Sequence, residues 1–360
     1  MDICLFTSSL YGGGAERVIC NLANYLCDKD NKVTVVTFGV CDRSYKLMDD
    51  VIVQPLLSLE EKAKKNKLLS IWIRIFRLYK FYKKNSCDVV ISMLPVPIIL
   101  TLFMKSIIRG KVIISERNFP GIYSPITKIL LKKLSTRADG YVFQTEDSMR
   151  WYGKNLFNCE IIPNAVNKNF FSRQYFGKRE KKIVSVGRLD KQKNHELLLK
   201  AFSLIIDEFG EYTLHIYGEG SERDQLTKMI KNLNLERKVF LEGNVENVVE
   251  GIYKATLFVL SSDYEGMPNA LIEAMSCGLP CVSTDFLGGG ARVLIENGKN
   301  GYLVKCNDVT GMSRCMKMIL SSEDIREKIG NNAAKINKQY SSEIIYSKWE
   351  RLIKRVCSND

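Results

Sequence analysis

The chain has 360 residues, of which 46% are hydrophobic and 26% charged, so it can fold into about two domains with real cores and is not a disordered chain. Its net charge is +13, and residues 1–174 hold 26 of the 53 Lys+Arg and 15 of the 40 Asp+Glu, which favours an anionic partner for the N-terminal half. The 11 cysteines and two histidines lack the spacing of a zinc site, and the odd, scattered cysteines are typical of a reduced, cytoplasmic protein.

The first half of the chain alternates apolar strands with helical stretches. Strands are predicted over 3–10, 32–40, 87–94, 111–116 and 140–145, and helices over 15–29, 68–84, 96–108 and 124–137. The longest apolar run, residues 89–104, contains two prolines and is shorter than the roughly 20 residues of a bilayer span. The alternation predicts a parallel sheet with helices on both faces.

The second half repeats this rhythm. Strands are predicted over 181–189, 212–220, 238–245, 255–262, 280–285 and 301–305, and helices over 195–209, 221–234 and 341–356. The polar stretch after Pro163 marks a boundary, so we expect domains at 1–168 and 169–340, followed by a C-terminal helix at 341–360. The predicted fold is α/β, with two Rossmann-like doubly wound domains and a ligand site in the cleft between them.

A run of three glycines, Gly12 to Gly14, separates the first strand from the first helix. Glycines at this place let the backbone approach a ligand, and the helix N-terminus offers amides to an anion. The run matches neither the dinucleotide-binding fingerprint nor the P-loop. A turn that only packs the strand on the helix is the alternative.

Three further loops follow predicted strands of the second half. In the first, Arg188 and Lys193 lie five residues apart before a helix, and a guanidinium with a mobile ammonium suits a diphosphate. A solvated basic loop is the alternative. The other two loops contain Glu219 and Val245 and are only suggestive by themselves.

The stretch 261–282 places two carboxylates, Glu265 and Glu273, eight residues apart. Pro268 suits the first turn of a helix, which is predicted to run over 269–276 and to end at Gly278. Glu265 would then lie beside the free amides of that turn, and a buried Glu273 would need hydroxyl or amide partners. The alternatives are a partner of the helix dipole for Glu265 and a solvent-facing helix position for Glu273.

Taken together in this order, Gly-Gly-Ala-Glu-Arg at 13–17, Gly-Arg-Leu at 187–189 with Lys193, and Glu-x7-Glu at 265–273 resemble the family 4 retaining glycosyltransferases of the GT-B fold over essentially the whole chain. Ser-Glu-Arg-Asn at 115–118 and Glu-Gly-Met-Pro-Asn at 265–269 resemble the bacterial branch. Its enzymes build O-antigen, capsule and related glycans on polyprenyl-diphosphate carriers. The resemblance implies two domains that face a central cleft, with the C-terminal helix packed back on the N-terminal domain.

The resemblance also implies roles for single residues. Arg188 and Lys193 would hold the diphosphate, Glu265 would lie beside the donor sugar, and Glu273 would bind the ribose hydroxyls. The other donor-binding residues would be Gly13, Gly14, Glu219, Val245, Gly266, Met267, Pro268 and Asn269. No cofactor and no divalent metal is expected, because cationic side chains and helix amides would neutralise the leaving diphosphate.

On the acceptor side the sequence departs from the family. Many members carry a histidine after the fourth strand of the N-terminal domain, and here the residues are Glu116, Arg117 and Asn118. Either Glu116 or Arg117 takes over an orienting role, or that role is dispensable. The expected donor is a UDP-sugar, and the expected acceptor is a saccharide linked to polyprenyl diphosphate.

The stretch 62–84 interleaves lysines and arginines with aromatic residues. An aromatic, basic amphipathic helix suits an anionic membrane surface, which predicts peripheral association with the cytoplasmic face of the inner membrane. A covering helix with a basic outer face is the alternative. Among other classes, the charge would fit a nucleic-acid-binding protein, but no binding motif is present and nucleic acid is not expected. A non-catalytic GT-B-like scaffold and, among enzymes, an epimerase or phosphorylase are the remaining alternatives.

Overall fold

The computed structural model describes residues 1–40, 45–58, 67–153, 156–171, 173–175 and 177–358. The chain divides into two compact units, one of residues 1–164 and 343–360 and the other of residues 165–342. The first boundary lies four residues before the predicted one. Val166 lies in the second unit, where its amide donates to the carbonyl of Tyr340 at 2.8 Å.

The N-terminal unit is built on a parallel sheet whose described strands lie in the order β3-β2-β1-β4-β5-β6-β7. These strands are β1 (Asp2–Thr7), β2 (Lys32–Thr37), β3 (Ile52–Pro55), β4 (Val89–Met93), β5 (Lys111–Ser115), β6 (Gly140–Phe143) and β7 (Cys159–Ile161). The central strands are apolar on both faces, as parallel strands between helix layers must be. The strand order changes direction between β1 and β4, and the glycine run follows β1.

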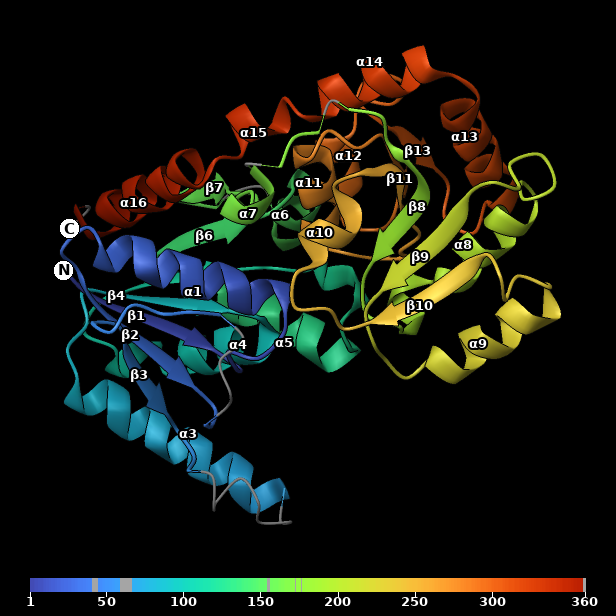
Figure 1. The fold of residues 1–360 in the computed structure, drawn as a ribbon. Coiled ribbons are helices and arrows are strands. Elements are labelled where there is room, and N and C mark those ends of the chain that lie inside the picture. The colour runs from blue at the N-terminus through green and yellow to red at the C-terminus, as the bar shows by residue number, and fades with distance from the viewer. Residues whose placement is uncertain (41–44, 59–66, 154–155, 172, 176, 359–360) are drawn as a thin grey trace. The chain divides into compact units, whose positions relative to one another are not determined.

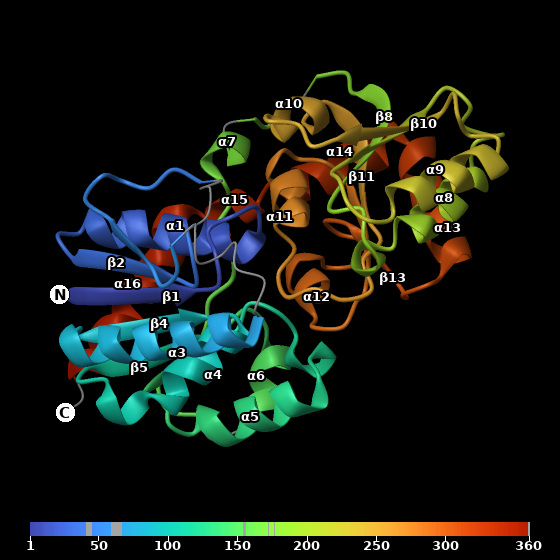
Figure 2. The same cartoon turned by 90° about the horizontal axis from the view of Figure 1, so that it is seen from below.

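Helices cover both faces of this sheet (Figures 1 and 2). They are α1 (Gly14–Cys27), α3 (Lys67–Lys84), α4 (Pro95–Phe103), α5 (Pro125–Ser135), α6 (Glu146–Tyr152) and α16 (Ser342–Ser358). Helices α3, α4 and α5 share one core with Cys4 and Phe6 of β1. The C-terminal helix α16 packs beside α1, where the rings of Tyr25 and Tyr346 lie 5.4 Å apart. The predicted return of this helix to the N-terminal unit is therefore confirmed.

The C-terminal unit contains a second parallel sheet, in the order β10-β9-β8-β11-β12-β13. Its described strands are β8 (Glu180–Val186), β9 (Thr213–Tyr217), β10 (Val239–Gly243), β11 (Ala255–Leu260), β12 (Cys281–Thr284) and β13 (Tyr302–Val304). Its described helices are α7 (Lys168–Phe171), α8 (His195–Ser203), α9 (Arg223–Asn232), α10 (Val248–Ile252), α11 (Asn269–Ser276), α12 (Gly290–Leu294), α13 (Val309–Ser321), α14 (Glu323–Ala333) and α15 (Ile336–Gln339). This sheet also lies between two layers of helices.

Alternation along the strands of this second sheet divides the core into two clusters. Ile183 points to the cluster under α8, α9 and α13, and the next residue, Val184, points to the cluster under α10, α11 and α12. Successive side chains of a strand point to opposite faces, so both faces of the sheet are buried. This confirms the predicted fold class of two doubly wound parallel-sheet domains.

Two predicted helices end earlier than expected, and some elements, such as α13 and α14, were not predicted. The helix predicted over 195–209 ends at Ser203, because beyond it the amide of Ile205 bonds to the carbonyl of Phe202, three residues back. The helix predicted over 96–108 ends at Phe103 and continues as a short 3-10 turn, Lys105–Ile107. The edge strand β3 was missed, because four residues that end in a proline carry too weak a pattern.

Candidate functional site

The loops predicted to bind the donor meet at the carboxyl ends of β8 and β11. These two strands are neighbours in the sheet, although 68 residues separate Val186 from Ala255 along the chain, and the strand order changes direction between them. Ligands of doubly wound sheets bind at such switch points. The C-terminal unit therefore has a candidate site where the loop of Arg188 and Lys193 faces the loop of Glu265.

An ion pair joins the two loops. The ammonium of Lys193 donates to Oε1 of Glu265, and the two side chains are only 13% and 12% exposed. Ser262 donates to the same carboxylate oxygen at 3.0 Å, and Ser261 donates to the backbone carbonyl of Lys193 at 2.8 Å. The structure thus brings together two of the three predicted catalytic residues, and an ammonium has two further N–H groups to offer a ligand.

The third predicted catalytic residue, Arg188, lies beside this pair with an exposed side chain. Its guanidinium contacts Asp190 at 3.0 Å and donates to Gln192 at 3.1 Å. Gln192 in turn donates to the carbonyl of Tyr264 at 2.9 Å, next to Glu265. Arg188 is 69% exposed, so a ligand can reach its guanidinium.

The predicted helix after Glu265 is confirmed as α11, Asn269–Ser276, with Gly278 at φ +71° beyond its end. Gly266, Met267 and Pro268 are buried where the chain enters the helix, and Asn269 is half-buried. Glu273 lies inside the helix and is 5% exposed. The solvent-facing alternative for Glu273 is therefore wrong, while its predicted contact with ribose stays a prediction.

A second glycine run, which sequence reasoning missed, closes on this loop. Gly288 and Gly289 have φ values of +104° and +72°, and α12 starts at Gly290. A Cβ atom on Gly290 would lie 2.1 Å from the carbonyl oxygen of Gly266. The signal was available, because three glycines after a predicted strand repeat the pattern of Gly12 to Gly14.

Replacing Gly290 with alanine is expected to weaken UDP binding at least about tenfold, and to lower the free energy of unfolding by about 1–3 kcal/mol. The new methyl group must displace the backbone of Gly266 and with it the loop that carries Glu265. Calorimetric titration with UDP and thermal unfolding measure the two effects. Gly298→Ala is the control: this glycine has φ +77° and no described atom within 4 Å, so it adds backbone strain without a clash. Equal UDP affinity in both variants would contradict the prediction.

The two remaining donor-side residues of the C-terminal unit follow the strands β9 and β10. Glu219 follows β9 and accepts from Arg223 at 2.7 Å, and both side chains are about 40% exposed. Gly218 has φ +141°, and a Cβ there would lie 2.1 Å from the carbonyl oxygen of Gly187. Val245 follows β10 and is 40% exposed. Both residues are accessible, and their contact with a donor stays a prediction.

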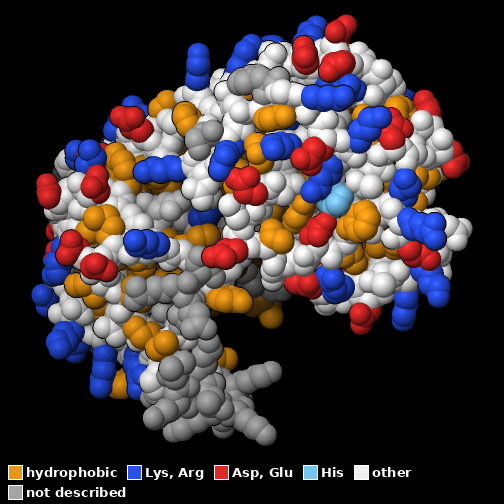
Figure 3. Space-filling model, in the orientation of Figure 1, with side chains coloured by type: hydrophobic (Ala, Val, Ile, Leu, Met, Phe, Trp, Pro, Cys, Tyr) orange, Lys and Arg blue, Asp and Glu red, His pale blue; other side chains and the backbone are white. Residues whose placement is uncertain are grey.

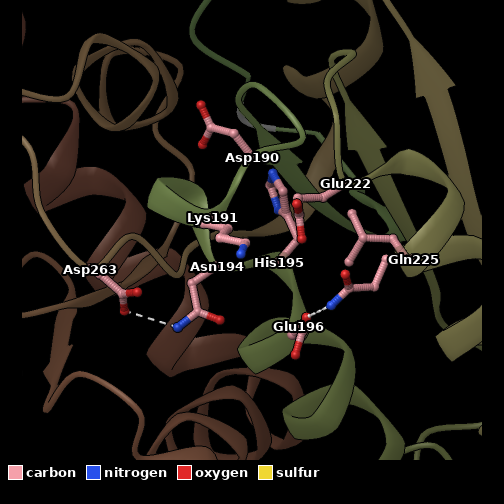
Figure 4. A pocket seen from close by; sticks show the side chains of 9 residues that line it. Asp190, Lys191, Asn194, His195, Glu196, Glu222, Gln225 and Asp263 are labelled. Carbon is pink, nitrogen blue, oxygen red and sulfur yellow. Dashed lines mark hydrogen bonds between the residues drawn. The ribbon is translucent and has the colours of Figure 1, made fainter.

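A cavity of about 330 Å³ lies beside the Lys193 loop (Figure 4). Its lining includes the carboxylates of Asp190, Glu196, Glu222 and Asp263 and the ammonium of Lys191. None of the predicted catalytic or donor-binding residues is among the lining residues. An excess of carboxylates repels a diphosphate, so this cavity is distinct from the candidate donor site.

A buried histidine at the start of α8 is among the residues that line the cavity. His195 is 3% exposed, and neither of its ring nitrogens has a hydrogen-bond partner among the described residues. The pKa of His195 is lowered to about 4, mainly by burial and also by the charge of Lys193, against the opposite effects of the Arg188 and Gly187 backbone and of Asp190. The imidazole is therefore neutral at physiological pH.

This histidine is expected to make the protein less stable in acid. Its pKa is about 6.5 when unfolded and about 4 when folded, so between these values the unfolded chain binds the extra proton and stability falls as the pH falls. The full effect is about 3 kcal/mol, present above pH 6.5 and lost towards pH 4. Denaturant unfolding of the protein and of His195→Gln from pH 7 to pH 4 measures it. The same pH slope in both proteins would contradict the prediction.

In the N-terminal unit, the predicted glycines form the turn into α1. Gly13 is the residue before the helix, and a Cβ on it would lie 2.0 Å from the carboxylate of Glu16. Gly12 has φ +70°. Next to this turn in the sheet, Leu94 follows β4 with φ +73°, a strained backbone that sequence reasoning did not single out. The segments that follow β1 and β4, between which the strand order changes direction, thus each contain a residue with positive φ.

The predicted acceptor-side residues form a buried network. Oε1 of Glu116 accepts from the backbone amides of Arg117 and Asn118 and from the Tyr123 hydroxyl at 2.7 Å, while Oε2 accepts from the Tyr152 hydroxyl at 2.9 Å. Burial raises the pKa of Glu116 despite these hydrogen bonds. The carboxylate is fully buried and holds this segment and the two tyrosine hydroxyls together, while an orienting role for Glu116 stays a prediction.

Arg117 is buried beside this network. Its guanidinium donates to Asn164 and to Ser115, and burial lowers its pKa to about 10. Asn118 is half-buried and accepts from the amide of Phe119 at 2.9 Å. Whether an acceptor contacts these residues stays a prediction.

Two family models match adjoining parts of the chain. Residues 12–170 match the model described as Glycosyltransferase Family 4, and residues 167–336 match the model described as Glycosyl transferases group 1. Together the two matches extend from the glycine run to the last helices of the C-terminal unit. The loops that carry Arg188, Lys193, Glu265 and Glu273 all lie within the second match.

Two curated relatives are similar along nearly their full length, and both come from Campylobacter jejuni. The first, an α-1,4-N-acetyl-D-galactosaminyltransferase named for a GalNAc-GalNAc-diNAcBac-PP-undecaprenol substrate, is 29% identical over 359 residues and covers 99% of both chains. The second, an N-acetylgalactosamine-N,N'-diacetylbacillosaminyl-diphospho-undecaprenol 4-alpha-N-acetylgalactosaminyltransferase, is 29% identical over 91% of this chain and 93% of its own.

The fold is similar to that of solved structures. The structure of HepE from Anabaena in complex with UDP and glucose has a TM-score of 0.84 at 18% identity, covering 98% of this chain and 99% of its own. A sucrose-phosphate synthase from Thermosynechococcus elongatus has a TM-score of 0.86 at 17% identity, covering 99% of each chain. At this identity the likeness establishes the GT-B architecture alone.

Proposed function

Because the chain belongs to the glycosyltransferases, with a family 4 domain followed by a group 1 domain, we propose that it moves a hexose or N-acetylhexosamine from a UDP-sugar to a saccharide linked to polyprenyl diphosphate. The product would enter a bacterial surface glycan such as O-antigen or capsule. The observation that carries the proposal is the ion pair of Lys193 and Glu265 at the switch point of the C-terminal sheet, with the exposed guanidinium of Arg188 on the same loop as Lys193.

The names of the relatives narrow the donor. The proposed donor sugars are GalNAc, Gal, Glc and GlcNAc, and both Campylobacter relatives are named as N-acetylgalactosaminyltransferases that act on undecaprenyl-diphosphate-linked sugars. UDP-GalNAc is therefore the first donor to test. The same names support a lipid-diphosphate acceptor.

The proposed reaction retains the anomeric configuration and needs no metal. The acceptor hydroxyl attacks the face of the sugar from which UDP leaves, and the departing phosphate oxygen accepts its proton. Arg188 and Lys193 stabilise the negative charge that grows on the diphosphate. Glu265 is held by Lys193 and Ser262, and a carboxylate so paired is a weak nucleophile, which favours this path over a double displacement through Glu265.

The test is a donor screen with purified protein. UDP-, GDP- and ADP-sugars are each supplied with a polyprenyl-diphosphate-linked saccharide and EDTA, and the released nucleotide is measured. We expect UDP release from one UDP-sugar that depends on the acceptor and persists in EDTA, and NMR of the product should give the donor's anomeric configuration.

Other outcomes of the screen separate the alternatives. Silence with every donor, together with no UDP binding, would reject the transferase and favour a non-catalytic or nucleic-acid-binding protein. Activity that EDTA abolishes and Mg²⁺ restores would reject metal independence alone. Inversion at the anomeric carbon would reject the proposed path while leaving the donor assignment intact.

We also propose that α3 attaches the protein to an anionic membrane surface. Leu69, Trp72, Phe76 and Tyr79 repeat at helical spacing and are 51%, 69%, 56% and 38% exposed. Lys80 lies 4.5 Å from the ring of Phe76. Such a face suits the lipid headgroup layer.

No helix within the described ranges has the length and hydropathy needed to cross a bilayer. Lys62, Lys64 and Lys65, which the sequence analysis included, lie outside the described residues.

Replacing both Trp72 and Phe76 with alanine is expected to weaken binding to anionic vesicles at least about tenfold. The variant loses the favourable transfer of two exposed rings from water into the lipid layer. Co-sedimentation at low salt measures the binding. Phe157→Ala is the control, since this ring is 84% exposed but lies outside α3. Vesicle binding that equals that of the unchanged protein would favour the alternative of a plain covering helix.

A further inference from the structure

A groove of about 910 Å³ lies between the C-terminal half of α3 and the edge of the N-terminal sheet. Its walls come from the starts of β1 and β2, from β3, and from α3. The groove is far larger than the space needed for one ordered water and falls within the roughly 300–1,000 Å³ typical of ligand sites. None of the predicted donor or acceptor residues lines it.

The groove is positively charged. Lys32, Arg77, Lys80 and Lys84 line it, against the single carboxylate of Asp2. Asp2 lies 3.4 Å from Lys32. Among the described residues, neither Lys80 nor Lys84 forms an ion pair with a carboxylate. Figure 3 shows Lys and Arg side chains gathered at the lower left, over α3. A groove with this excess of cations favours an anion.

Apolar side chains also line the groove, together with the polar residues Thr34, Gln54, Asn85 and Ser86. Ile3, Ile52, Leu56 and Phe81 line the groove among the cations. Lys80 belongs to both surfaces, since it lines the groove and lies over the ring of Phe76. An occupant that combines a phosphate with hydrocarbon therefore fits better than a soluble anion.

We propose that this groove binds one anionic phospholipid, with the headgroup phosphate among Lys32, Lys80 and Lys84 and the upper part of a chain against Ile52 and Phe81. The inference deepens the membrane attachment proposed above and rests on it. The lipid would fix α3 at a defined depth in the headgroup layer. The cations would bind the phosphate, and the rings of Trp72 and Phe76 would enter the layer.

Native mass spectrometry in detergent micelles tests the groove without a membrane surface. The full chain is titrated with dioleoylphosphatidylglycerol, with dioleoylphosphatidylcholine, and with glycerol 1-phosphate. We expect one tightly held phosphatidylglycerol, about thirty-fold weaker retention in the Lys32→Gln, Lys84→Gln double variant, and retention within about twofold of wild type in the Lys228→Gln, Lys231→Gln control. The control removes the same charge from α9, in the other unit.

Each other outcome overturns a stated part of the proposal. Equal loss in both double variants would reduce the effect to net charge. Equal retention of phosphatidylcholine would exclude recognition of an anionic headgroup. Glycerol 1-phosphate binding as tightly as the lipid would make the groove a site for soluble phosphates. UDP binding is measured in parallel, so lipid retention without UDP binding would reject the proposed transferase and keep the groove, and the reverse would reject the groove alone.

Discussion

Replacing Arg188 with alanine lowers the turnover of sugar transfer by at least about 100-fold and leaves the free energy of unfolding nearly unchanged. The guanidinium is 69% exposed, and its contacts with Asp190 and Gln192 are surface contacts of small worth. Its proposed work is to stabilise the charge on the leaving diphosphate, where one strong donor supplies ~3–4 kcal/mol. Released UDP measures turnover, and urea unfolding measures stability.

The matched control for this prediction is Arg173→Ala. Arg173 also pairs with a carboxylate in the C-terminal unit, Glu250 at 2.7 Å, is 47% exposed, and has no predicted role in the site. Both variants should fold, and only Arg188→Ala should lose turnover. Near-normal turnover of Arg188→Ala would remove Arg188 from the site.

Replacing Lys193 with methionine costs both stability and activity. The ammonium and the Glu265 carboxylate are 13% and 12% exposed, so the variant leaves a largely buried carboxylate with Ser262 as its hydroxyl partner. Breaking a buried pair on one side typically costs about 3–5 kcal/mol. Turnover should fall at least about 100-fold, because the diphosphate loses a cation.

A double-variant cycle separates these two effects. Glu265→Gln alone should also destabilise the protein, while Lys193→Met with Glu265→Gln should be more stable than the sum of the single changes implies, since no charge remains unpaired. All three variants should show strongly reduced turnover of sugar transfer. Lys182→Met is the control, because Lys182 bonds to the Tyr217 hydroxyl at 2.7 Å rather than to a carboxylate. Additive losses of stability would show that the pair is not coupled.

Local pattern was enough to predict the elements that surround the candidate site. Helix α11 has the predicted bounds, because Pro268 at its start and Gly278 beyond its end are signals that depend only on neighbouring residues. The strands before Arg188 and Glu265 are apolar runs that only a sheet covered on both faces can bury. The prediction was wrong for elements without such signals. The edge strand β3 was missed, and α8 ends six residues before its predicted end.

The fold class, the loops that carry the candidate residues and the family could be predicted from the amino-acid sequence, because periodicity, glycine runs and motif order are read along the chain. Which loops meet depends on the packing of the folded protein. Lys193 and Glu265 are 72 residues apart and pair because β8 lies next to β11, an order set by the packing of whole helices and strands. The same packing buries Glu116 among two tyrosines, leaves His195 without a hydrogen-bond partner among the described residues, and opens the cationic groove beside α3. Burial and long-range pairing depend on the sum of many contacts, so no stretch of sequence carries them alone.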